Sequence, residues 1–273
     1  MPISVEERLD TLTQAQFSDI AYEVMREAFS VHKELGSLFD EAVYRNALAD
    51  RLKDVVTEVR IDVSFQEFHK VYFMDALVSG DGVFELKAVK GLSSHHRTQL
   101  LNYLFLTGLH HGKLINFGTA QVEHEFVNSK LTYADRTSFA VDDRDGTETE
   151  GFAIREKDLL LEILHDWGTG LDRTLYQYVL FHGLGGADNV LTKRDVRQRG
   201  QCIAQQTVSV CGASTGIRLT TFQNGTESYH QELVRLMRAT GLTSIQWVNV
   251  ARRTVTFETL HISVPHISVT KEG

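Results

Sequence analysis

The segment VYFMDALVSGDGVFELK, which ends at Lys87, constrains the fold more than any other part of the sequence. Two strand-like runs flank a Ser-Gly-Asp-Gly connection, a pattern typical of a tight β-hairpin. Because side chains alternate between the two faces of a strand, Glu85 and Lys87 should project from the same face. If the hairpin pairs in simple register about its turn, Asp75 lies almost opposite Glu85. The sequence therefore predicts two carboxylates and one ammonium on one patch of sheet.

The neighbours of this charged patch are apolar, with Val-Phe before Glu85 and Ala-Val after Lys87, as in an interior strand. Charges are costly to bury unless they are paired or bind a metal. The D-x9-E-x-K spacing alone would also fit an exposed strand with an ordinary Glu–Lys pair. The apolar flanks favour a hydrolytic site instead, in which the acids bind Mg²⁺ or Mn²⁺ and the lysine positions or activates the attacking water.

Bulk properties restrict the partners of the chain. Its 273 residues are enough for two modest domains, and a net charge of −8 gives no overall attraction to a polyanion. Any contact with nucleic acid must therefore come from local positive patches and bound metal. There is no run of eighteen apolar residues and no apolar leader at the start, from which we expect a cytoplasmic protein without membrane contacts. Cys202 and Cys211 form no CxxC pair and are expected to be reduced core residues.

In the first half, the sequence predicts the order helix, helix, three strands, helix, two strands. The helices are expected over 17–35, 38–55 and 95–111, and the strands over 58–65, 71–78, 82–88, 113–117 and 123–127, after a polar, partly helical lead-in over 1–14. Glu41 and Tyr44 lie three apart on the second helix and so share a face, although Glu41 also fits a plain surface acid. Gln99 and Tyr103 lie four apart on the third helix. These two side chains could form hydrogen bonds to a nucleic-acid backbone, or they could simply be part of the helix surface.

Five blocks in the first half, in order, resemble the GxxExxY protein family of the PD-(D/E)XK nuclease-like superfamily. They are VHKELGSLFDEAVYRNAL, MDAL, FELKAV, QLLNYLFLTGL and KLINFG, and they fall within about residues 18–130. The family usually has a second glycine after LG, whereas this chain has Leu38. That departure alters a turn and touches no catalytic role.

The resemblance implies roles for residues already singled out by their pattern. It implies that Asp75 and Glu85, with the backbone carbonyl of Leu86, ligate Mg²⁺ and that Lys87 acts on the attacking water. It further implies that Glu41 helps to hold the metal from its helix. The Gln99-x-x-x-Tyr103 element is similar to the QxxxY element of the RecB-like branch, which accompanies the handling of DNA strands or ends.

The second half repeats the element order of the first. Expected helices lie over 155–167, 172–182 and 227–240, and expected strands over 190–197, 202–210, 215–221, 245–250 and 254–260. LGSLFDEAVYRNAL aligns without gaps to WGTGLDRTLYQYVL, 132 residues later, and TGLHHGKLINF to TGLTSIQWVNV, 133 residues later. Either block alone fits convergence on a common helix-cap pattern, but both at nearly one offset predict a duplication.

The offset leaves no charged ligand of the candidate site in place, and a site with Val and two Arg where carboxylates should be cannot hold Mg²⁺. Glu41 falls on Arg173, Asp75 on Val208, Glu85 on Arg218, Lys87 on Thr220 and Gln99 on Glu232. We therefore expect a nuclease-like domain over 1–130, a linker over 131–150 and a degenerate, pseudo-nuclease domain over 151–273. The degenerate copy is expected to form half of an intramolecular pseudo-dimer. A less favoured alternative is that Arg173 and Arg218 bind a phosphate group. In a third interpretation, they are surface arginines without a role.

The expected fold is thus α/β, with two tandem restriction-endonuclease-like domains, each a mixed sheet flanked by helices and the second degenerate. The expected function is a Mg²⁺-dependent nuclease that hydrolyses phosphodiester bonds in DNA, with its active site in the N-terminal domain only. The alternative is a catalytically inactive nucleic-acid-binding or assembly module that retains a vestigial nuclease motif.

Overall fold

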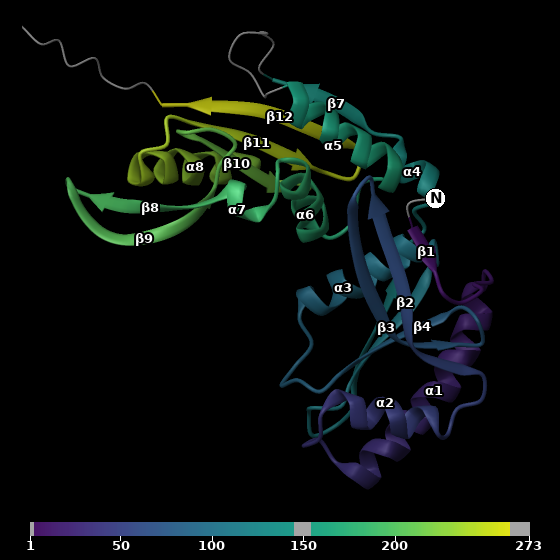
Figure 1. Ribbon diagram of the computed structural model, residues 1–273. Helices are drawn as coiled ribbons and strands as arrows, with labels where there is room; N and C mark the ends of the chain where they lie inside the picture. The colour runs from purple at the N-terminus through teal and green to yellow at the C-terminus, as the bar shows by residue number, and fades with distance from the viewer. Residues whose placement is uncertain (1–2, 145–153, 263–273) are drawn as a thin grey trace, which may run out of the picture. The chain divides into compact units, whose positions relative to one another are not determined.

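The structure, a computed structural model, describes residues 3–144 and 154–262. The chain divides into two compact units (Figure 1). Unit 1 comprises Met1–Thr137 with His165–Asp172, and unit 2 comprises Ser138–Leu164 with Arg173–Gly273. The two units are not separated by one boundary in the sequence, because the short segment His165–Asp172 belongs to unit 1.

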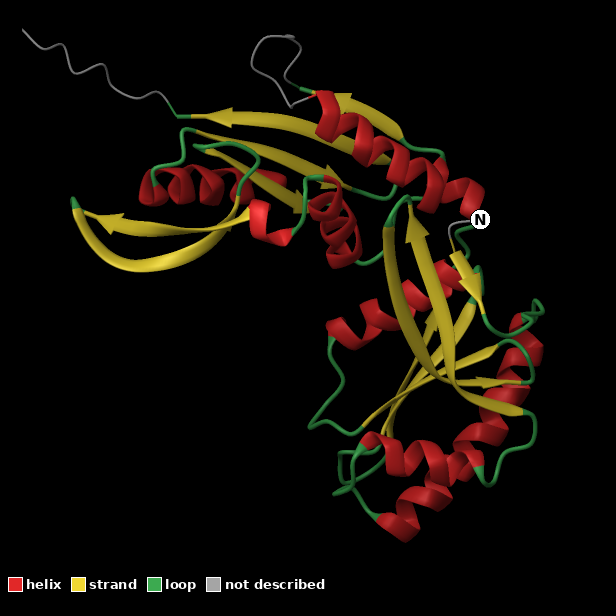
Figure 2. Ribbon diagram, viewed as in Figure 1, coloured by secondary structure: helices red, strands yellow, loops and turns green. Residues whose placement is uncertain are grey.

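Unit 1 is a single mixed sheet with helices beside it, as Figure 2 shows by colour. Its elements are β1 (Ile3–Val5), α1 (Gln14–Leu35), α2 (Glu41–Ala49), β2 (Val55–Phe65), β3 (Phe68–Val78), β4 (Gly82–Lys87), α3 (Ser94–Thr107), β5 (His111–Asn116), β6 (Glu123–Asn128) and α4 (Tyr133–Thr137). The described strands lie in the order β1-β2-β3-β4-β5-β6, in which β4 and β5 pair in parallel and the other neighbours are antiparallel. The predicted α/β fold, with a mixed sheet flanked by helices, is confirmed.

Helix α1 follows the expected apolar pattern closely. At its start, Gln16 N donates to the Thr13 side chain at 3.3 Å, and Thr13 N donates to the Gln16 side chain at 2.9 Å, a capping box. Its buried residues recur at helical spacing: Phe17, Ala21, Val24, Met25, Ala28 and Val31. Gly36 follows the last turn with a φ of 75°, a conformation that glycine adopts without steric cost.

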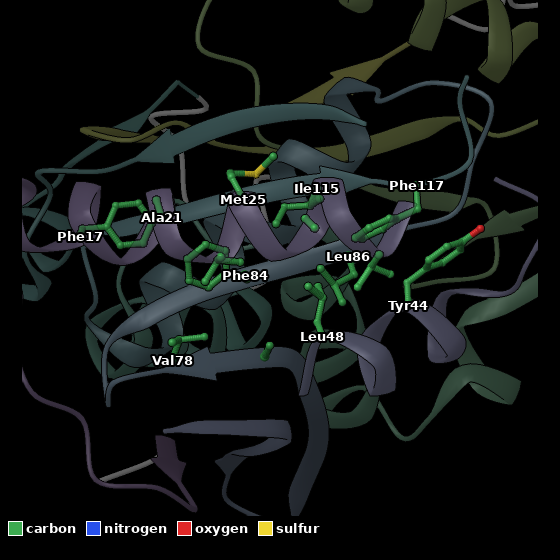
Figure 3. Close-up of a cluster of buried hydrophobic side chains, with 14 residues drawn as sticks. Phe17, Ala21, Met25, Tyr44, Leu48, Val78, Phe84, Leu86, Ile115 and Phe117 are labelled. Carbon is green, nitrogen blue, oxygen red and sulfur yellow. The ribbon is translucent and has the colours of Figure 1, made fainter. Parts of the chain in front are cut away.

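The buried face of α1 and part of α2 pack on β4 and β5, as Figure 3 shows. The ring of Phe17 stacks on that of Phe84 with centroids 5.8 Å apart. The ring of Tyr44, on α2, lies nearly parallel to that of Phe117 with centroids 4.5 Å apart. Each large apolar side chain buried in this way contributes about 1.5–3 kcal/mol relative to exposure. This core fixes α2 against the strand that carries Glu85.

The hairpin predicted from the sequence is present between β3 and β4. Its pairs are Val78–Gly82, Leu77–Val83 and Ala76–Phe84. Ser79 and Gly80, in the turn, both have positive φ, 53° and 79°. The paired ladder ends at Ala76–Phe84, one position short of Asp75 and Glu85, and the backbone N–H of Leu86 donates to the Asp75 carboxylate at 2.8 Å.

Unit 2 has a similar order of elements, with the short helix α7 added before β8, but a different arrangement of sheets. Its elements are β7 (Ala140–Asp143), α5 (Ile154–Trp167, whose last residues group with unit 1), α6 (Arg173–Gly183), α7 (Ala187–Val190), β8 (Leu191–Gln198), β9 (Gln201–Ser209), β10 (Thr215–Thr220), α8 (Thr226–Thr240), β11 (Ser244–Val250) and β12 (Thr254–His261). One sheet has the order β10-β11-β12-β7, and β8 and β9 form a separate two-stranded sheet.

Strand pairing in the two units follows one register after a shift of 133 residues. Lys87 pairs with Asn116 across β4–β5, and Thr220 pairs with Asn249 across β10–β11. Both pairs of strands are parallel, and β5–β6 and β11–β12 are both antiparallel.

A side-chain clamp is repeated at the same shift. The Asn116 amide accepts from Val89 N and donates to Val89 O, both at 3.0 Å. The Asn249 amide accepts from Phe222 N at 2.8 Å and donates to Phe222 O at 2.9 Å. Asn116 ends β5 and Asn249 lies one residue before the end of β11. Each side-chain amide binds the backbone two residues after the neighbouring parallel strand, β4 or β10.

Several expectations about local structure are wrong. Part of the expected linker, residues 131–144, contains α4 and β7, and the rest lies outside the described residues. The lead-in contains β1, which pairs with β2, instead of helical structure before Gln14. The second helix is shorter than expected because β2 already begins at Val55.

Two further corrections concern unit 2. The strands expected to form one sheet are split, and a single bridge between Val210 and Gly216 links the end of β9 to β10. Residues 201–207 of β9 are all exposed, whereas its last two residues, Val208 and Ser209, are buried. Cys202 lies on this exposed strand and is not a core residue, whereas Cys211 is partly buried, and both are free thiols.

Among the helices of residues 3–144 and 154–262, none has both the length and the apolar character needed to cross a membrane.

Candidate active site

The hairpin β3–β4 places the candidate residues inside the sheet. All six residues of β4 are buried, as predicted from its apolar flanks. The exposed fraction is 1% for Glu85, 8% for Lys87 and 9% for Asp75. These three ionisable groups are therefore largely removed from water, and their charges must be balanced by one another or by a ligand.

The ammonium of Lys87 contacts oxygens from every predicted ligand. Its Nζ lies 2.7 Å from Glu85 Oε1, 2.7 Å from the Leu86 carbonyl oxygen, 3.3 Å from Glu41 Oε2 and 3.8 Å from Asp75 Oδ2. The residues that the sequence selected from two strands and a helix thus meet at one point.

Asp75 is held by two donors. The backbone N–H of Leu86 donates to Asp75 Oδ2 at 2.8 Å, and Arg45 Nη1 lies 3.5 Å from Asp75 Oδ1. Arg45 also reaches Glu58 Oε1 at 3.0 Å, and Glu58 has a φ of 55°, which is uncommon for a residue other than glycine. Sequence reasoning missed Arg45 and Glu58. The available signal was the spacing of Arg45, four residues after Glu41 on the same helix.

Helix α2 gives Glu41 and Tyr44 different environments. Glu41, the first residue of the helix, reaches Lys87 across the site. Tyr44 is fully buried, and its hydroxyl donates to Gly36 O at 2.8 Å and accepts from Phe39 N at 3.2 Å. Tyr44 therefore fixes the start of α2, and this fixes the position of Glu41.

Gln99 and Tyr103 lie on α3, within the electrostatic influence of the acids. Gln99 Nε2 donates to the Tyr103 hydroxyl at 3.1 Å. Burial raises the pKa of Tyr103 strongly, and the charges of Glu85, Asp75 and Glu41 raise it further. The predicted pair is thus formed beside the acid cluster, and its role toward a nucleic acid stays a prediction.

The carboxyl groups at this site bind protons more tightly than usual. Burial, with a contribution from the charge of Asp75, raises the pKa of Glu85 to about 8. Burial and the charge of Asp75 also raise the pKa of Glu41. For Lys87, burial alone would lower the pKa, but the surrounding Glu85, Asp75 and Glu41 raise it overall. The site has more acidic than basic groups, so the addition of positive charge should stabilise it.

The donor set suits a hard divalent cation. Oε2 of Glu85 is buried and has no hydrogen-bond partner among the described residues, whereas Oδ2 of Asp75 accepts from Leu86 N. Carboxylates and a backbone carbonyl are the ligands that Mg²⁺ and Mn²⁺ prefer. Within the described ranges, no three His, Cys, Asp or Glu side chains are already arranged around a metal position. The oxygens that would serve as ligands instead contact the Lys87 ammonium, so a metal would have to displace some of those contacts.

Comparison with known families assigns the part of the chain that contains this site. Residues 18–128 match the model of the PD-(D/E)XK nuclease superfamily. These residues form a PD-(D/E)XK nuclease superfamily domain. All six candidate side chains, and the Leu86 carbonyl, lie within the PD-(D/E)XK domain.

Other comparisons add little about this PD-(D/E)XK domain. No curated protein matches the chain. Among the solved structures that match is the crystal structure of SSO0001, with 23% identity and a TM-score of 0.29. The match covers 43% of this chain and 65% of the SSO0001 chain.

Proposed function

We propose that unit 1 is a metal-dependent nuclease that hydrolyses phosphodiester bonds in DNA. The observation that carries the proposal is the meeting of Asp75, Glu85 and Lys87 from one hairpin with Glu41 from α2, inside a PD-(D/E)XK domain. Superfamily membership supports a nuclease in general. The buried carboxylates support a divalent metal, Mg²⁺ or Mn²⁺, as its cofactor.

We assign each residue of the site a role in metal binding or in catalysis. Asp75, Glu85 and the Leu86 carbonyl would hold the ion, with help from Glu41. The ion, when bound, would polarise the scissile phosphate and lower the pKa of a bound water. Lys87 has a raised pKa and is therefore charged at neutral pH. It would act as a hydrogen-bond donor that orients the attacking water or the phosphate, and not as the base.

The finer assignment to the GxxExxY family is also part of the proposal. It is supported by the separate environments of Glu41 and Tyr44, because one reaches the acid cluster and the other anchors α2. Leu38, at the position of the usual second glycine, is 96% exposed. Gln99 and Tyr103 would contact the phosphate backbone of DNA from α3.

We further propose that unit 2 arose by duplication of the nuclease-like fold and has lost its chemistry. The shared strand register and the repeated asparagine clamp support the duplication. Arg173, Arg218 and Thr220 stand at the positions of Glu41, Glu85 and Lys87. The role of unit 2 as an intramolecular pseudo-dimer partner remains a prediction.

Cleavage assays with site variants test the nuclease. Glu85→Ala and Lys87→Ala should each abolish Mg²⁺-dependent cleavage of a labelled DNA oligonucleotide. Matched controls are Glu67→Ala and Lys130→Ala, which change exposed residues outside the site. Circular dichroism of each variant would show whether the fold is kept. Cleavage at the parent rate by folded Glu85→Ala and Lys87→Ala would contradict the proposal.

The alternative, an inactive nucleic-acid-binding module, draws support from the net charge of −8 and from the missing ligands in unit 2. Calorimetric titration with Mn²⁺ separates the two functions. The nuclease requires a metal site that is lost on Asp75→Asn or Glu85→Gln. A chain that binds DNA but no Mn²⁺ at these residues would favour the alternative.

A further inference from the structure

Unit 2 has a small pocket at the place that corresponds to the acid cluster of unit 1. The pocket has a volume of about 40 Å³, and Arg173, Gln177, Ser209, Arg218 and Tyr229 supply its polar groups. These residues come from α6, the end of β9, β10 and α8. A polar cavity of this size has room for more than one water molecule, because about 10–15 Å³ is enough for one.

The two arginines of the pocket have no acidic partners among the described residues. Arg218 lies on β10 between the buried residues Ile217 and Leu219 and is itself only partly exposed. Within the described part of the chain it forms no ion pair or hydrogen bond, and Arg173 bonds only to the Gln177 amide, at 3.2 Å. Guanidinium groups bind phosphate oxygens through paired, charge-assisted hydrogen bonds. Two guanidinium groups without counter-charges at one pocket therefore favour an anion there.

A second observation concerns the hairpin of β8 and β9, which continues from the pocket. Ser209, the last residue of β9, lines the pocket, and Figure 1 shows the two strands as a ribbon beside α8, separate from the main sheet of unit 2. The ribbon has four basic residues and one acid: Lys193, Arg194, Arg197, Arg199 and Asp195. Unit 2 has 14 Lys and Arg and 14 Asp and Glu, so it lacks the acidic excess that gives the whole chain a net charge of −8.

We propose that unit 2 binds the phosphate backbone of DNA, with one phosphate between Arg173 and Arg218 and neighbouring phosphates along the β8–β9 ribbon. The inference rests on the proposed function, because the arginines stand where unit 1 has Glu41 and Glu85. In unit 1 a cation would be needed between acids and phosphate. In unit 2 the protein itself supplies the positive charge, so binding there should not need a metal.

Fluorescence anisotropy of the full chain with a labelled DNA duplex, in EDTA, tests the proposal without any cleavage. Arg173→Gln/Arg218→Gln should weaken DNA binding by about tenfold or more. The plot of log K against log salt should also become less steep by about 1, because one phosphate contact is lost. The matched control is Arg235→Gln/Arg238→Gln, which removes two exposed charges from α8. It should change the affinity by less than about twofold, as expected for charges outside the contact surface.

A second variant tests the ribbon. Lys193 and Arg199 are exposed and form no ion pair within the described residues. Lys193→Gln/Arg199→Gln should also weaken binding and lower the salt slope. Equal losses in the pocket variant and the α8 control, or no binding of DNA by the parent chain in EDTA, would overturn the proposal.

Inorganic phosphate separates the two sources of a phosphate group. If the pocket serves a free phosphate compound, phosphate alone will bind the parent chain and not Arg173→Gln/Arg218→Gln, while both chains bind DNA equally. That result would overturn the assignment to DNA. Arginine-dependent DNA binding by a chain that never cleaves DNA would leave this inference standing and would contradict only the nuclease.

Discussion

The ammonium of Lys87 lies 2.7 Å from Oε1 of Glu85, two residues earlier on the same buried strand. The other oxygen of that carboxylate has no hydrogen-bond partner in the part of the chain that the structure describes. Burial raises the pKa of Glu85 to about 8 in spite of the ammonium. The ammonium therefore compensates the charge of the Glu85 carboxylate only in part. Burial of such a charge lowers the stability of the fold, and it favours the binding of a further positive charge.

The first prediction concerns the pH dependence of stability in EDTA. Between a pH of about 4.5 and about 8 the unfolded chain has lost the proton of Glu85 while the folded chain keeps it. The free energy of unfolding of the parent should therefore fall as pH rises through this range. Glu85→Gln removes the titration. Its free energy of unfolding relative to the parent should rise from pH 5 to pH 8 by up to about 4 kcal/mol.

Urea unfolding followed by circular dichroism at pH 5 and pH 8 measures this difference. Glu67→Gln, at an exposed position, provides the control and should show the same difference from the parent at both pH values. A relative stability of Glu85→Gln that stays constant or falls between pH 5 and pH 8 would contradict the raised pKa of Glu85.

The second prediction separates metal binding from catalysis. The Lys87 ammonium contacts Glu85 Oε1 and the Leu86 carbonyl, two of the oxygens proposed as metal ligands. A unit positive charge and a divalent cation about 4 Å apart repel by about 8 kcal/mol at an effective dielectric constant of about 20. Lys87→Met should therefore bind Mn²⁺ at least about tenfold more tightly than the parent, yet lose cleavage.

Calorimetric titration with Mn²⁺ gives the affinity, and the oligonucleotide assay gives the activity. Lys130→Met, which changes an exposed lysine, should leave both unchanged. Weaker Mn²⁺ binding by folded Lys87→Met would mean that the ammonium supports the metal site instead of competing with it.

The sequence predicted the acid cluster well because its geometry follows from local rules. A short turn fixes the register of a hairpin, and register together with strand alternation fixes which side chains meet. Asp75 and Glu85 could therefore be matched from the positions of Ser79 and Gly80 alone. The place of Glu41 depended on packing between α2 and β4, and only the family resemblance pointed to it.

Other features depend on contacts that no local pattern reveals. Arg45 joins the site because it spans from α2 to Asp75 and to Glu58, a residue with unusual φ. In unit 2, β9 has the length and composition of a sheet strand but pairs with β8 in a separate two-stranded sheet, and no local pattern of its residues indicates which sheet it joins. Strand β7 was missed because it has only four residues and pairs with β12, which is distant in the sequence.

The third prediction tests Arg45 as a positioning residue. Its guanidinium contacts Asp75 and Glu58 and has no place among the proposed metal ligands. Removal of a partner that orients a ligand typically lowers metal affinity or activity about 10–100-fold. Arg45→Gln should therefore lower kcat/KM by about that factor and weaken Mn²⁺ binding.

Arg51→Gln is the matched control, because Arg51 also lies near α2 but bonds to Glu34 and Ser30. This control should keep kcat/KM within about twofold of the parent, since its contacts lie outside the site. The same loss in both variants, or normal Mn²⁺ affinity in Arg45→Gln, would show that Arg45 acts only on stability.

The fourth prediction concerns Lys113, a buried lysine on β5 that the proposed chemistry does not use. Lys113 is 2% exposed, its Nζ lies 3.4 Å from the ring centroid of Phe126, and no carboxylate in the described ranges pairs with it. Burial lowers its pKa to about 8. Below pH 8 both the folded and the unfolded chain carry the proton. Between pH 8 and about 10.5 only the unfolded chain does, so stability should rise with pH in that window.

Allowing for screening by water, the rise should be about 1–2 kcal/mol. Lys113→Met keeps the apolar stem without the charge, so it should abolish the rise and stabilise the fold at pH 7 by a similar amount. Lys130→Met, the exposed control, should keep the pH dependence of the parent. Urea unfolding at pH 7 and pH 10 measures both effects. A Lys113→Met variant that is less stable than the parent at pH 7 would mean that the contact with the Phe126 ring outweighs the cost of burying the charge.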